Sequence, residues 1–275
     1  MNNSSCTKIA IILCSLFCSI PYHFAQTKDN NSQSFPNITF NDVYGLKHAK
    51  ETLSEISRHF DRVDQYEIEN NFPKIYLLAG PSCTGKTYIA EALEGEIHKQ
   101  TGRKINVWFF SAQRLIDCDT KFLERIANDF APCIVHIDDI DQLIGSKLIF
   151  FDKFFSAIKD SAGQIIIIAE TRKLKKLTEF IASYGKYSQI VIFDYPTVDE
   201  REDFLKGKYS EFLLDLDIHC LAQQTEALSF HDLETVLREA LRRAKLSDAR
   251  PTQGHLDQAI NETQKHRQND FFQLS

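Results

Sequence analysis

The chain has 275 residues, of which 43% are hydrophobic, 25% charged and 11% aromatic. This composition is typical of one folded domain with a small appendage, and it excludes a disordered or fibrous protein. The formal net charge of -6 excludes a broad basic surface that would hold nucleic acid nonspecifically, so we expect no nucleic-acid partner.

The chain begins with an apolar segment. Residues 9–20 read IAIILCSLFCSI, and the small residue Ala25 follows them. This pattern is typical of a secretory signal peptide, while residues 9–25 together approach the length of a short membrane anchor. A buried helix of the folded domain is disfavoured, because polar residues 26–33 separate the segment from the rest. We expect a signal-like or anchor segment at 1–25 and a membrane-anchored or exported protein, with a cytoplasmic one as the alternative.

A linker rich in Asn, Ser and Gln follows at residues 26–37, and the globular part begins after it. Five short apolar runs then alternate with amphipathic stretches, as expected of parallel strands that are buried on both faces. The runs are KIYLLAG (74–80), KINVWFF (104–110), CIVHID (133–138), QIIIIAE (164–170) and QIVIFD (189–194). We predict an α/β domain over 38–197, with a doubly wound five-stranded parallel sheet.

After this domain the pattern changes to helices. Ser229 and Asp232 have the spacing of a capping box in front of a helical apolar stripe. The stripe comprises Leu233, Val236, Leu237, Ala240, Leu241 and Ala244. We therefore predict a small helical lid domain over 198–268, with a tail at 269–275.

A phosphate-binding loop is indicated between the first strand and the helix after it. The residues GPSCTGKT fit the pattern G-x-x-x-x-G-K-[ST]. Its two glycines let the backbone curl, so that N–H groups at a helix N-terminus face the phosphates. Lys86 would add a positive charge at the terminal phosphates, and Thr87 would offer its hydroxyl to Mg²⁺. The predicted nucleotide-binding residues are Gly80, Pro81, Ser82, Cys83, Thr84, Gly85, Lys86, Thr87 and Tyr88.

The alternative, a coincidental glycine turn, is disfavoured because strand, loop and helix agree.

Acidic residues also end a neighbouring strand in CIVHIDDID. Asp138 would lie at the carboxyl edge of the sheet and hold magnesium through water, and Asp139 would polarise the attacking water. We expect Asp141 to cap the following helix. The competing interpretation is that all three acids simply begin a helix.

At this point the sequence resembles the AAA+ family, most closely the ATPase modules of membrane-anchored FtsH-type proteases. The resemblance covers residues 38–245 and rests on ITFNDVYGLKHAKETLSEI, GPSCTGKT, APCIVHIDDID, IIIIAET, DYPTVDERE and LSFHDLETVLREA in the family's order. It implies ATP and Mg²⁺ as cofactors, a protein partner or substrate, and a homo-oligomeric ring. It also implies that Asp42, Val43, Tyr44 and Gly45 line the adenine pocket.

The departures from the family pattern concern catalysis. Asp139 stands where the family has Glu, and a misplacement of about 1 Å can cost on the order of 100-fold in rate. Arg172 replaces a polar Asn that positions water. Lys186 and Gln189 stand where two arginines reach the neighbouring subunit's nucleotide, and Lys lacks the planar fork of Arg. The candidate catalytic residues are therefore Asp139, Lys86, Arg172 and Lys186, and we predict slow or impaired hydrolysis.

Further departures lie outside the catalytic positions. Phe230 and His231 replace small residues that face the nucleotide, and the segment between 110 and 131 lacks the aromatic pore loop of the family. We assign Phe122 to a helix core. The sequence contains no H-E-x-x-H, so we predict no zinc protease. Two functions remain in view, a slow ATPase and a non-hydrolysing nucleotide-dependent switch or scaffold, with an ordinary unfoldase ranked last.

Overall fold

The structure is a computed structural model. It describes residues 26–27, 38–61, 72–102, 105–117, 122, 125–126, 129–143, 145, 148–159, 164–213, 216–248 and 250–274. The predicted leader at 1–25 lies outside the described residues, as do residues 28–37 of the predicted linker. Within the described parts of the chain, no helix combines the length and the apolar character needed to cross a membrane.

A parallel sheet forms the centre of the first part of the chain. Each predicted apolar run overlaps one of its strands: β2 (Ile75–Ala79), β3 (Asn106–Ser111), β4 (Cys133–Asp138), β5 (Ile165–Thr171) and β6 (Ser188–Ile192). These five strands pair in parallel in the order β3-β4-β5-β2-β6, which confirms the predicted five-stranded parallel sheet. The two-residue β1 (Gln26–Thr27) adds an antiparallel pair to the outer edge of β3.

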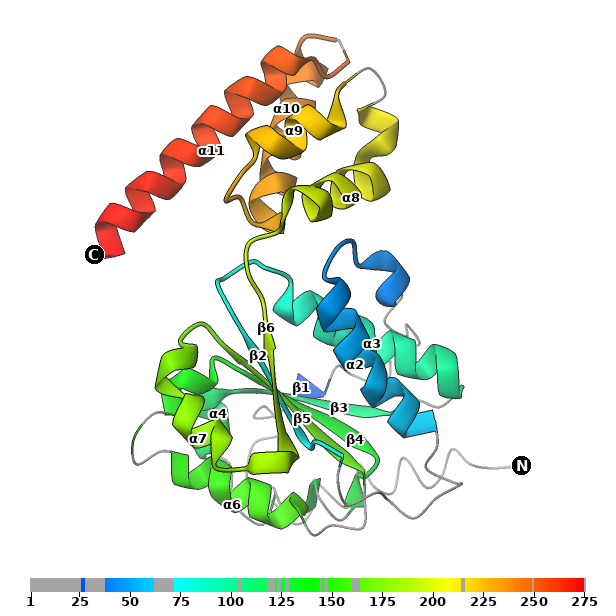
Figure 1. The fold of residues 1–275 in the computed structure, drawn as a ribbon, viewed down its shortest axis with the longest axis vertical. Coiled ribbons are helices and arrows are strands. Elements are labelled where there is room, and N and C mark those ends of the chain that lie inside the picture. The colour runs from blue at the N-terminus through cyan, green and yellow to red at the C-terminus, as the bar shows by residue number, and fades with distance from the viewer. Residues whose placement is uncertain are drawn as a thin grey trace.

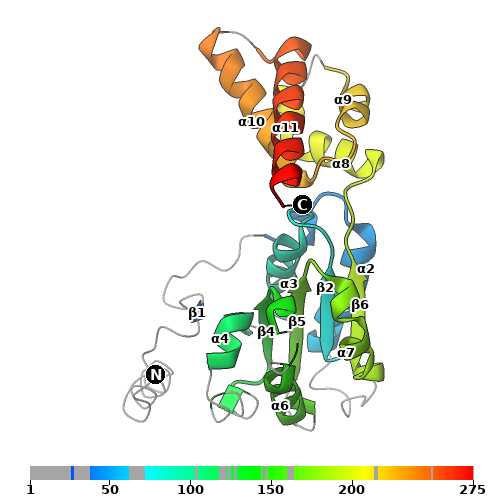
Figure 2. The same cartoon turned by 90° about the vertical axis from the view of Figure 1, so that its left-hand side faces the viewer.

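Helices cover both faces of the sheet (Figures 1 and 2). They are α2 (Lys47–Asp61), α3 (Lys86–Thr101), α4 (Ala112–Asp117), α6 (Leu148–Lys159) and α7 (Thr178–Ala182). Short 3-10 turns complete this part: η1 (Phe40–Asp42), η2 (Ile140–Leu143), η3 (Leu174–Lys176) and η4 (Gly185–Tyr187). Because side chains alternate along a strand, Tyr76 and Leu78 of β2 enter the core formed with α2 and α3, and Ile75 and Leu77 enter the core formed with α4, α6 and α7.

Helices make up the structure from residue 198 onward. They are α8 (Val198–Tyr209), η5 (Ser210–Phe212), α9 (Ile218–Gln224), α10 (Phe230–Leu246) and α11 (Gln253–Leu274), and we call this part the lid. The predicted capping box is confirmed, because the Asp232 N–H donates to Ser229 Oγ and the Asp232 carboxylate accepts from the Ser229 N–H. Leu233, Val236 and Leu237 of α10 pack into the apolar core of the lid.

The lid lies beyond the carboxyl edge of the sheet and is hydrogen-bonded to the segment that precedes α2 (Figure 1). The Tyr44 hydroxyl donates to the Gly207 carbonyl at 3.0 Å. The next two backbone N–H groups donate to carboxylates of α8, Gly45 to Asp203 and Leu46 to Glu200, both at 2.9 Å. These contacts place residues 42–46 between the sheet and the lid.

Candidate functional site

The glycine-rich loop leaves β2 and enters α3, as predicted. At Gly80 a Cβ would lie 2.1 Å from the carbonyl oxygen of Phe193, so a side chain cannot fit there. Gly85, the residue before α3, has φ 95°, a left-handed conformation that glycine adopts without strain. No side chain caps the N-terminus of α3, so its first N–H groups are available to an anion.

Lys86 is folded back onto this loop. Its side chain is buried, and its ammonium donates to the carbonyls of Gly80 at 2.9 Å and Pro81 at 2.6 Å. Burial lowers the pKa of Lys86, although the nearby Glu170 carboxylate opposes this shift. The structure thus holds a buried ammonium within the loop, where a phosphate oxygen can replace the two carbonyls as its acceptor.

Acidic groups gather at the ends of β4 and β5. Asp138 is the last residue of β4, and burial raises its pKa, reinforced by the charges of Glu170 and Asp139. The Thr87 hydroxyl donates to Glu170 Oε2 at 2.9 Å. The predicted metal-binding residues Thr87 and Asp138 thus both lie near Glu170, a third polar group that was not predicted from the sequence.

The hydroxyl of Thr87 and the carboxylate of Asp138 are suitable oxygen ligands for magnesium bound together with a nucleotide. Mg²⁺ is commonly held by one or two protein oxygens, with water and phosphate oxygens supplying the rest of its coordination. In the parts of the chain that the structure describes, no group of three or more His, Cys, Asp or Glu side chains is placed to hold a metal alone. Thr87 and Asp138 are the residues that would hold the ion, which would neutralise phosphate charge there.

The second strand-end carboxylate, Asp139, is held by its neighbours. Asp139 Oδ1 accepts from Arg172 Nη2 at 3.0 Å, and Oδ2 accepts from Gln142 Nε2 at 3.3 Å. The residue also has φ 51°, which costs a non-glycine residue energy. Two of the predicted catalytic residues thus contact each other, and the contact engages the carboxylate that was expected to polarise water.

The prediction that Asp141 caps the following helix is wrong. Asp141 lies within η2 and is buried, and its Oδ1 accepts from the Thr171 hydroxyl at 2.9 Å and from the Arg172 N–H at 3.4 Å. The η2 turn directs this side chain back to the end of β5. Its role is to hold the β5 terminus, and with it the backbone of Arg172.

Lys186 is the predicted catalytic residue that the structure keeps away from the loop. It lies in η4, directly before β6, and Ser188 of β6 pairs with Ile75 at the start of β2. The glycine-rich loop follows the opposite end of β2, at Ala79. Lys186 therefore lies at the amino edge of the sheet, where it cannot serve its own chain's loop.

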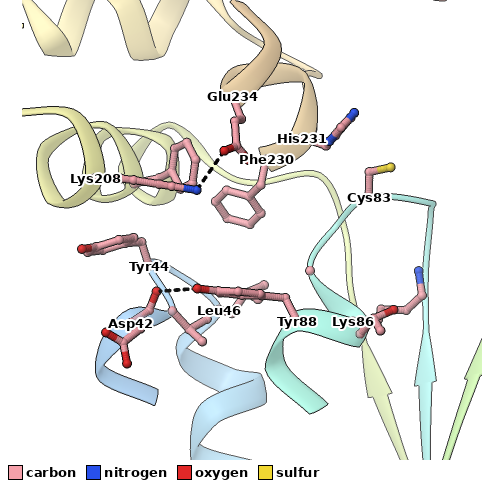
Figure 3. Close-up of a pocket in the computed structure, with 14 residues that line it drawn as sticks. Asp42, Tyr44, Leu46, Cys83, Lys86, Tyr88, Lys208, Phe230, His231 and Glu234 are labelled. Atoms are coloured by element: carbon pink, nitrogen blue, oxygen red, sulfur yellow. Dashed lines mark hydrogen bonds and ion pairs between the residues drawn. The ribbon is translucent and has the colours of Figure 1, made fainter. Parts of the chain in front are cut away.

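A cavity of about 320 Å³ opens between the loop, residues 42–46 and the lid (Figure 3). Its lining residues are Asp42, Val43, Tyr44, Leu46, Cys83, Gly85, Lys86, Thr87, Tyr88, Phe204, Lys208, Phe230, His231 and Glu234. The structure thus brings most of the predicted binding residues together. The remaining ones, Gly45, Gly80, Pro81, Ser82 and Thr84, belong to the adjoining backbone outside the cavity wall.

Aromatic rings form the wall of the cavity away from the loop. The Phe230 ring projects from α10 towards Tyr44 and Tyr88 (Figure 3), and its centroid lies 5.4 Å from that of Phe204. Phe204 was not predicted from the sequence, and neither was the Lys208–Glu234 pair, whose Nζ and Oε1 atoms are 3.1 Å apart. Helical spacing could have revealed them, because Lys208 follows Phe204 by four residues and Glu234 follows Phe230 by four.

A strand, a glycine-rich loop and a helix at the carboxyl edge of a parallel sheet, together with a strand-end aspartate, define a P-loop nucleotide-binding module with a helical lid. Residues 76–195 match the family described as the ATPase family associated with various cellular activities (AAA). This part of the chain is therefore a domain of the AAA ATPase family, a family of nucleotide-binding proteins.

Proteins named FtsH are similar in sequence to this chain across the ATPase region. The ATP-dependent zinc metalloprotease FtsH of Clostridium perfringens is 31% identical over 250 residues, which cover 81% of this chain and 34% of that protein. Its counterpart from Thermus thermophilus is 29% identical over 246 residues, covering 80% of this chain and 38% of that protein. The chain thus spans little more than a third of the length of these relatives.

Solved AAA structures share the fold. The FIGL-1 AAA domain in complex with ADP aligns with a TM-score of 0.68 and 20% identity, covering 92% of this chain and 90% of that one. A katanin structure, described as a structural basis for katanin self-assembly, aligns with a TM-score of 0.60 and 20% identity over 86% and 87%. These likenesses show the fold of an AAA module across both the sheet and the lid.

Proposed function

We propose that this AAA module binds ATP with magnesium in the cavity between sheet and lid and hydrolyses it slowly. The carrying observation is that the buried Lys86 ammonium, the uncapped N-terminus of α3 and the Thr87 hydroxyl all belong to one loop at the cavity wall. That combination suits a triphosphate. The similarity to an AAA domain solved with ADP supports an adenine nucleotide as the ligand.

The base of the nucleotide would lie against the aromatic wall. The rings of Tyr44, Tyr88 and Phe230 lie on the side of the cavity away from the Lys86 ammonium (Figure 3), and Phe204 also lines the cavity. Aromatic rings favour a flat heteroaromatic base through burial and stacking. The triphosphate end would then reach the loop.

Slow hydrolysis follows from the state of Asp139. A general base must reach the attacking water with a free acceptor oxygen. Both carboxylate oxygens of Asp139 accept hydrogen bonds, one of them from the guanidinium of Arg172. The paired guanidinium fixes the position of this carboxylate and competes with water for its oxygen atoms.

A non-hydrolysing nucleotide switch is the second candidate. It is favoured by the hydrogen bonds that join residues 44–46, at the cavity, to helix α8 of the lid. Residues 44–46 line or border the cavity and are bonded directly to Gly207, Asp203 and Glu200 of α8. A nucleotide seated against residues 42–46 would bias the position of the lid through these bonds. A protein partner that contacts the lid could then respond to nucleotide occupancy.

Phosphate release from the chain lacking residues 1–25 separates the two candidates, with a Lys86→Ala variant as the background. Release above that background, together with magnesium-dependent ATP binding, supports the slow ATPase. ATP binding without release supports the switch. Absence of both ATP binding and release overturns both candidates.

We also propose that the module assembles into a homo-oligomeric ring, in which Lys186, which lies too far from its own loop to act there, would approach a neighbouring subunit's nucleotide. Native mass measurement with and without ATP tests this proposal. A ring that forms with ATP in the wild type and weakens in Lys186→Ala supports it, and a persistent monomer contradicts it.

We also propose that residues 9–25 direct the protein to a membrane, as a cleaved signal or as an anchor. Cell fractionation followed by N-terminal sequencing of the mature protein tests this. A membrane-bound or exported protein supports the proposal, and an uncleaved cytoplasmic protein contradicts it.

A further inference from the structure

A buried acid–imidazole pair lies directly beneath the glycine-rich loop. His136 Nε2 and Glu170 Oε1 are 2.7 Å apart, and both side chains are 4% exposed. The other carboxylate oxygen, Glu170 Oε2, accepts from the Thr87 hydroxyl at 2.9 Å. Glu170 therefore connects a core histidine to the residue assigned to magnesium.

Strand order explains how three distant residues meet. β5 lies between β2, which leads into the loop, and β4, which carries His136 and Asp138. Glu170 is in register with Leu78 of β2, and its neighbour Ala169 is in register with Ile137 of β4. Its carboxylate thus lies on the sheet face covered by α3, at the level of the strand-end aspartate.

Core stability does not account for this pair. A buried charged or polar pair loses hydration that its mutual attraction only partly restores, and apolar residues of similar size commonly stabilise a core as well or better. The neighbouring side chains on the same face of these strands, Ile134, Ile166 and Ile168, are apolar. The contact with Thr87 gives the pair a role that apolar residues could not perform.

We propose that Glu170, held by His136, is a positioning residue for magnesium-dependent nucleotide binding, an inference that rests on the function proposed above. A hydroxyl has one hydrogen to donate and two lone pairs to offer. Because the Thr87 hydrogen points to Glu170, the lone pairs of its oxygen are left for a metal ion. A carboxylate acceptor also makes that oxygen a better ligand, as outer partners of metal ligands do.

The direction in which Glu170→Gln changes ATP affinity, with and without magnesium, separates a positioning role from a structural one. Glu170 places negative charge close to the loop, so without magnesium it repels a triphosphate. Glu170→Gln removes that repulsion, and metal-free ATP should bind equally well or more tightly. With magnesium the same variant should bind more weakly, by about 10-fold, because outer partners of metal ligands typically contribute 10–100-fold in metal affinity. A folding defect would weaken binding in both conditions.

The experiment is titration of the full chain with a fluorescent ATP analogue, in magnesium and in EDTA. Wild type, Glu170→Gln, Thr87→Val and the double variant are compared, so that the coupling between the two side chains is measured. We expect each single variant to lose a similar part of the magnesium-dependent gain, and the double variant to lose little more. Additive losses, or an unchanged ratio in Glu170→Gln, overturn the inference.

Two further variants serve as a matched control and as a substitute for Glu170→Gln. Glu96→Gln changes another buried glutamate of the same core region, on α3 away from the loop, and should keep the wild-type magnesium ratio. If Glu170→Gln fails to fold, the double variant H136F/E170A removes both partners, leaves no buried charge alone, and should show the same loss. A wild type without magnesium-dependent binding overturns the proposed function as well, whereas normal wild-type binding with an unchanged variant overturns only the role of Glu170.

Discussion

Arg172 Nη2 donates to Asp139 Oδ1 at 3.0 Å, joining the ends of neighbouring strands β5 and β4 across the carboxyl edge of the sheet. Both side chains are partly exposed, so this pair adds little to stability. Its consequence is chemical, because the ion pair holds the Asp139 carboxylate in place and sets one positive charge against it.

Arg172→Asn should raise ATP turnover. The substitution frees Asp139 and introduces an amide that can bind water, and we expect phosphate release to rise about 10-fold, a fraction of what general-base catalysis contributes. Asp139→Glu should add to this gain, since the longer side chain reaches further from the strand end. Single-turnover phosphate release measures both effects. Lys175→Ala, which removes an exposed cation of the same region, is the matched control. A rate in Arg172→Asn at or below wild type would refute this role of the ion pair.

Phe230→Ala should weaken adenine nucleotide binding. The ring lies in the cavity beside Phe204, and an aromatic contact contributes about 0.5–1.5 kcal/mol beyond burial, or roughly 2–10-fold in affinity. Calorimetry with ATP and with inorganic triphosphate checks this, because only ATP carries the base. Phe212→Ala, an exposed phenylalanine outside the cavity, should change neither affinity. Equal losses for ATP and triphosphate, or tighter ATP binding, would contradict the aromatic wall.

Gly207→Ala should loosen the lid from residues 42–46. A Cβ at this position would lie 1.9 Å from Cε1 of Tyr44, so the tyrosine ring must move and its hydrogen bond to the Gly207 carbonyl is lost. Overpacking of this kind costs about 1–3 kcal/mol in the free energy of unfolding. Urea unfolding measures the loss, and Gly254→Ala is the control because a Cβ there meets its nearest atom at 3.8 Å. Unchanged stability together with unchanged ATP affinity would show that this contact does not hold the lid.

The cysteines provide a chemical readout of the loop. Cys83 is exposed in the cavity wall, whereas burial raises the pKa of the Cys133 thiol to about 12. Because the thiolate is the reactive form, we expect iodoacetamide at pH 8 to label Cys83 and to leave Cys133 unmodified in the folded protein. Saturating ATP with magnesium should slow Cys83 labelling at least about 10-fold, since the bound ligand covers the loop. Peptide mass spectrometry follows both sites, and nucleotide-independent Cys83 labelling would contradict the placement of the triphosphate.

Much of the fold could be predicted because the pattern is local. The strands at 75–79 and 165–171 are continuous apolar runs, and the loop from Gly80 to Thr87 has a spacing that requires a strand before it and a helix after it. The helical stripe behind Ser229 was equally explicit. The order β3-β4-β5-β2-β6 is a property of the whole sheet and was observed only in the structure.

The site was predictable where one motif contained it and unpredictable where it is assembled from distant segments. Nothing in the sequence near Glu170 indicates that it meets Thr87, because the two residues are 83 positions apart and join only through strand order. The Arg172–Asp139 pair likewise joins residues 33 positions apart. Asp141 was misassigned because the η2 turn, rather than a helix start, follows β4 and directs this side chain into the core.

The central claim is that the loop at Gly80 to Thr87 collects the triphosphate of ATP and that magnesium strengthens the binding. Isothermal calorimetry on the folded chain, in magnesium and in EDTA, tests it most directly when Lys86→Ala is measured beside the wild type. We expect saturable ATP binding that tightens with magnesium and weakens by about 10–100-fold in Lys86→Ala, the range for loss of a charged hydrogen bond. Folded wild-type protein that binds no ATP, or that binds it equally with and without magnesium and Lys86, would contradict the account.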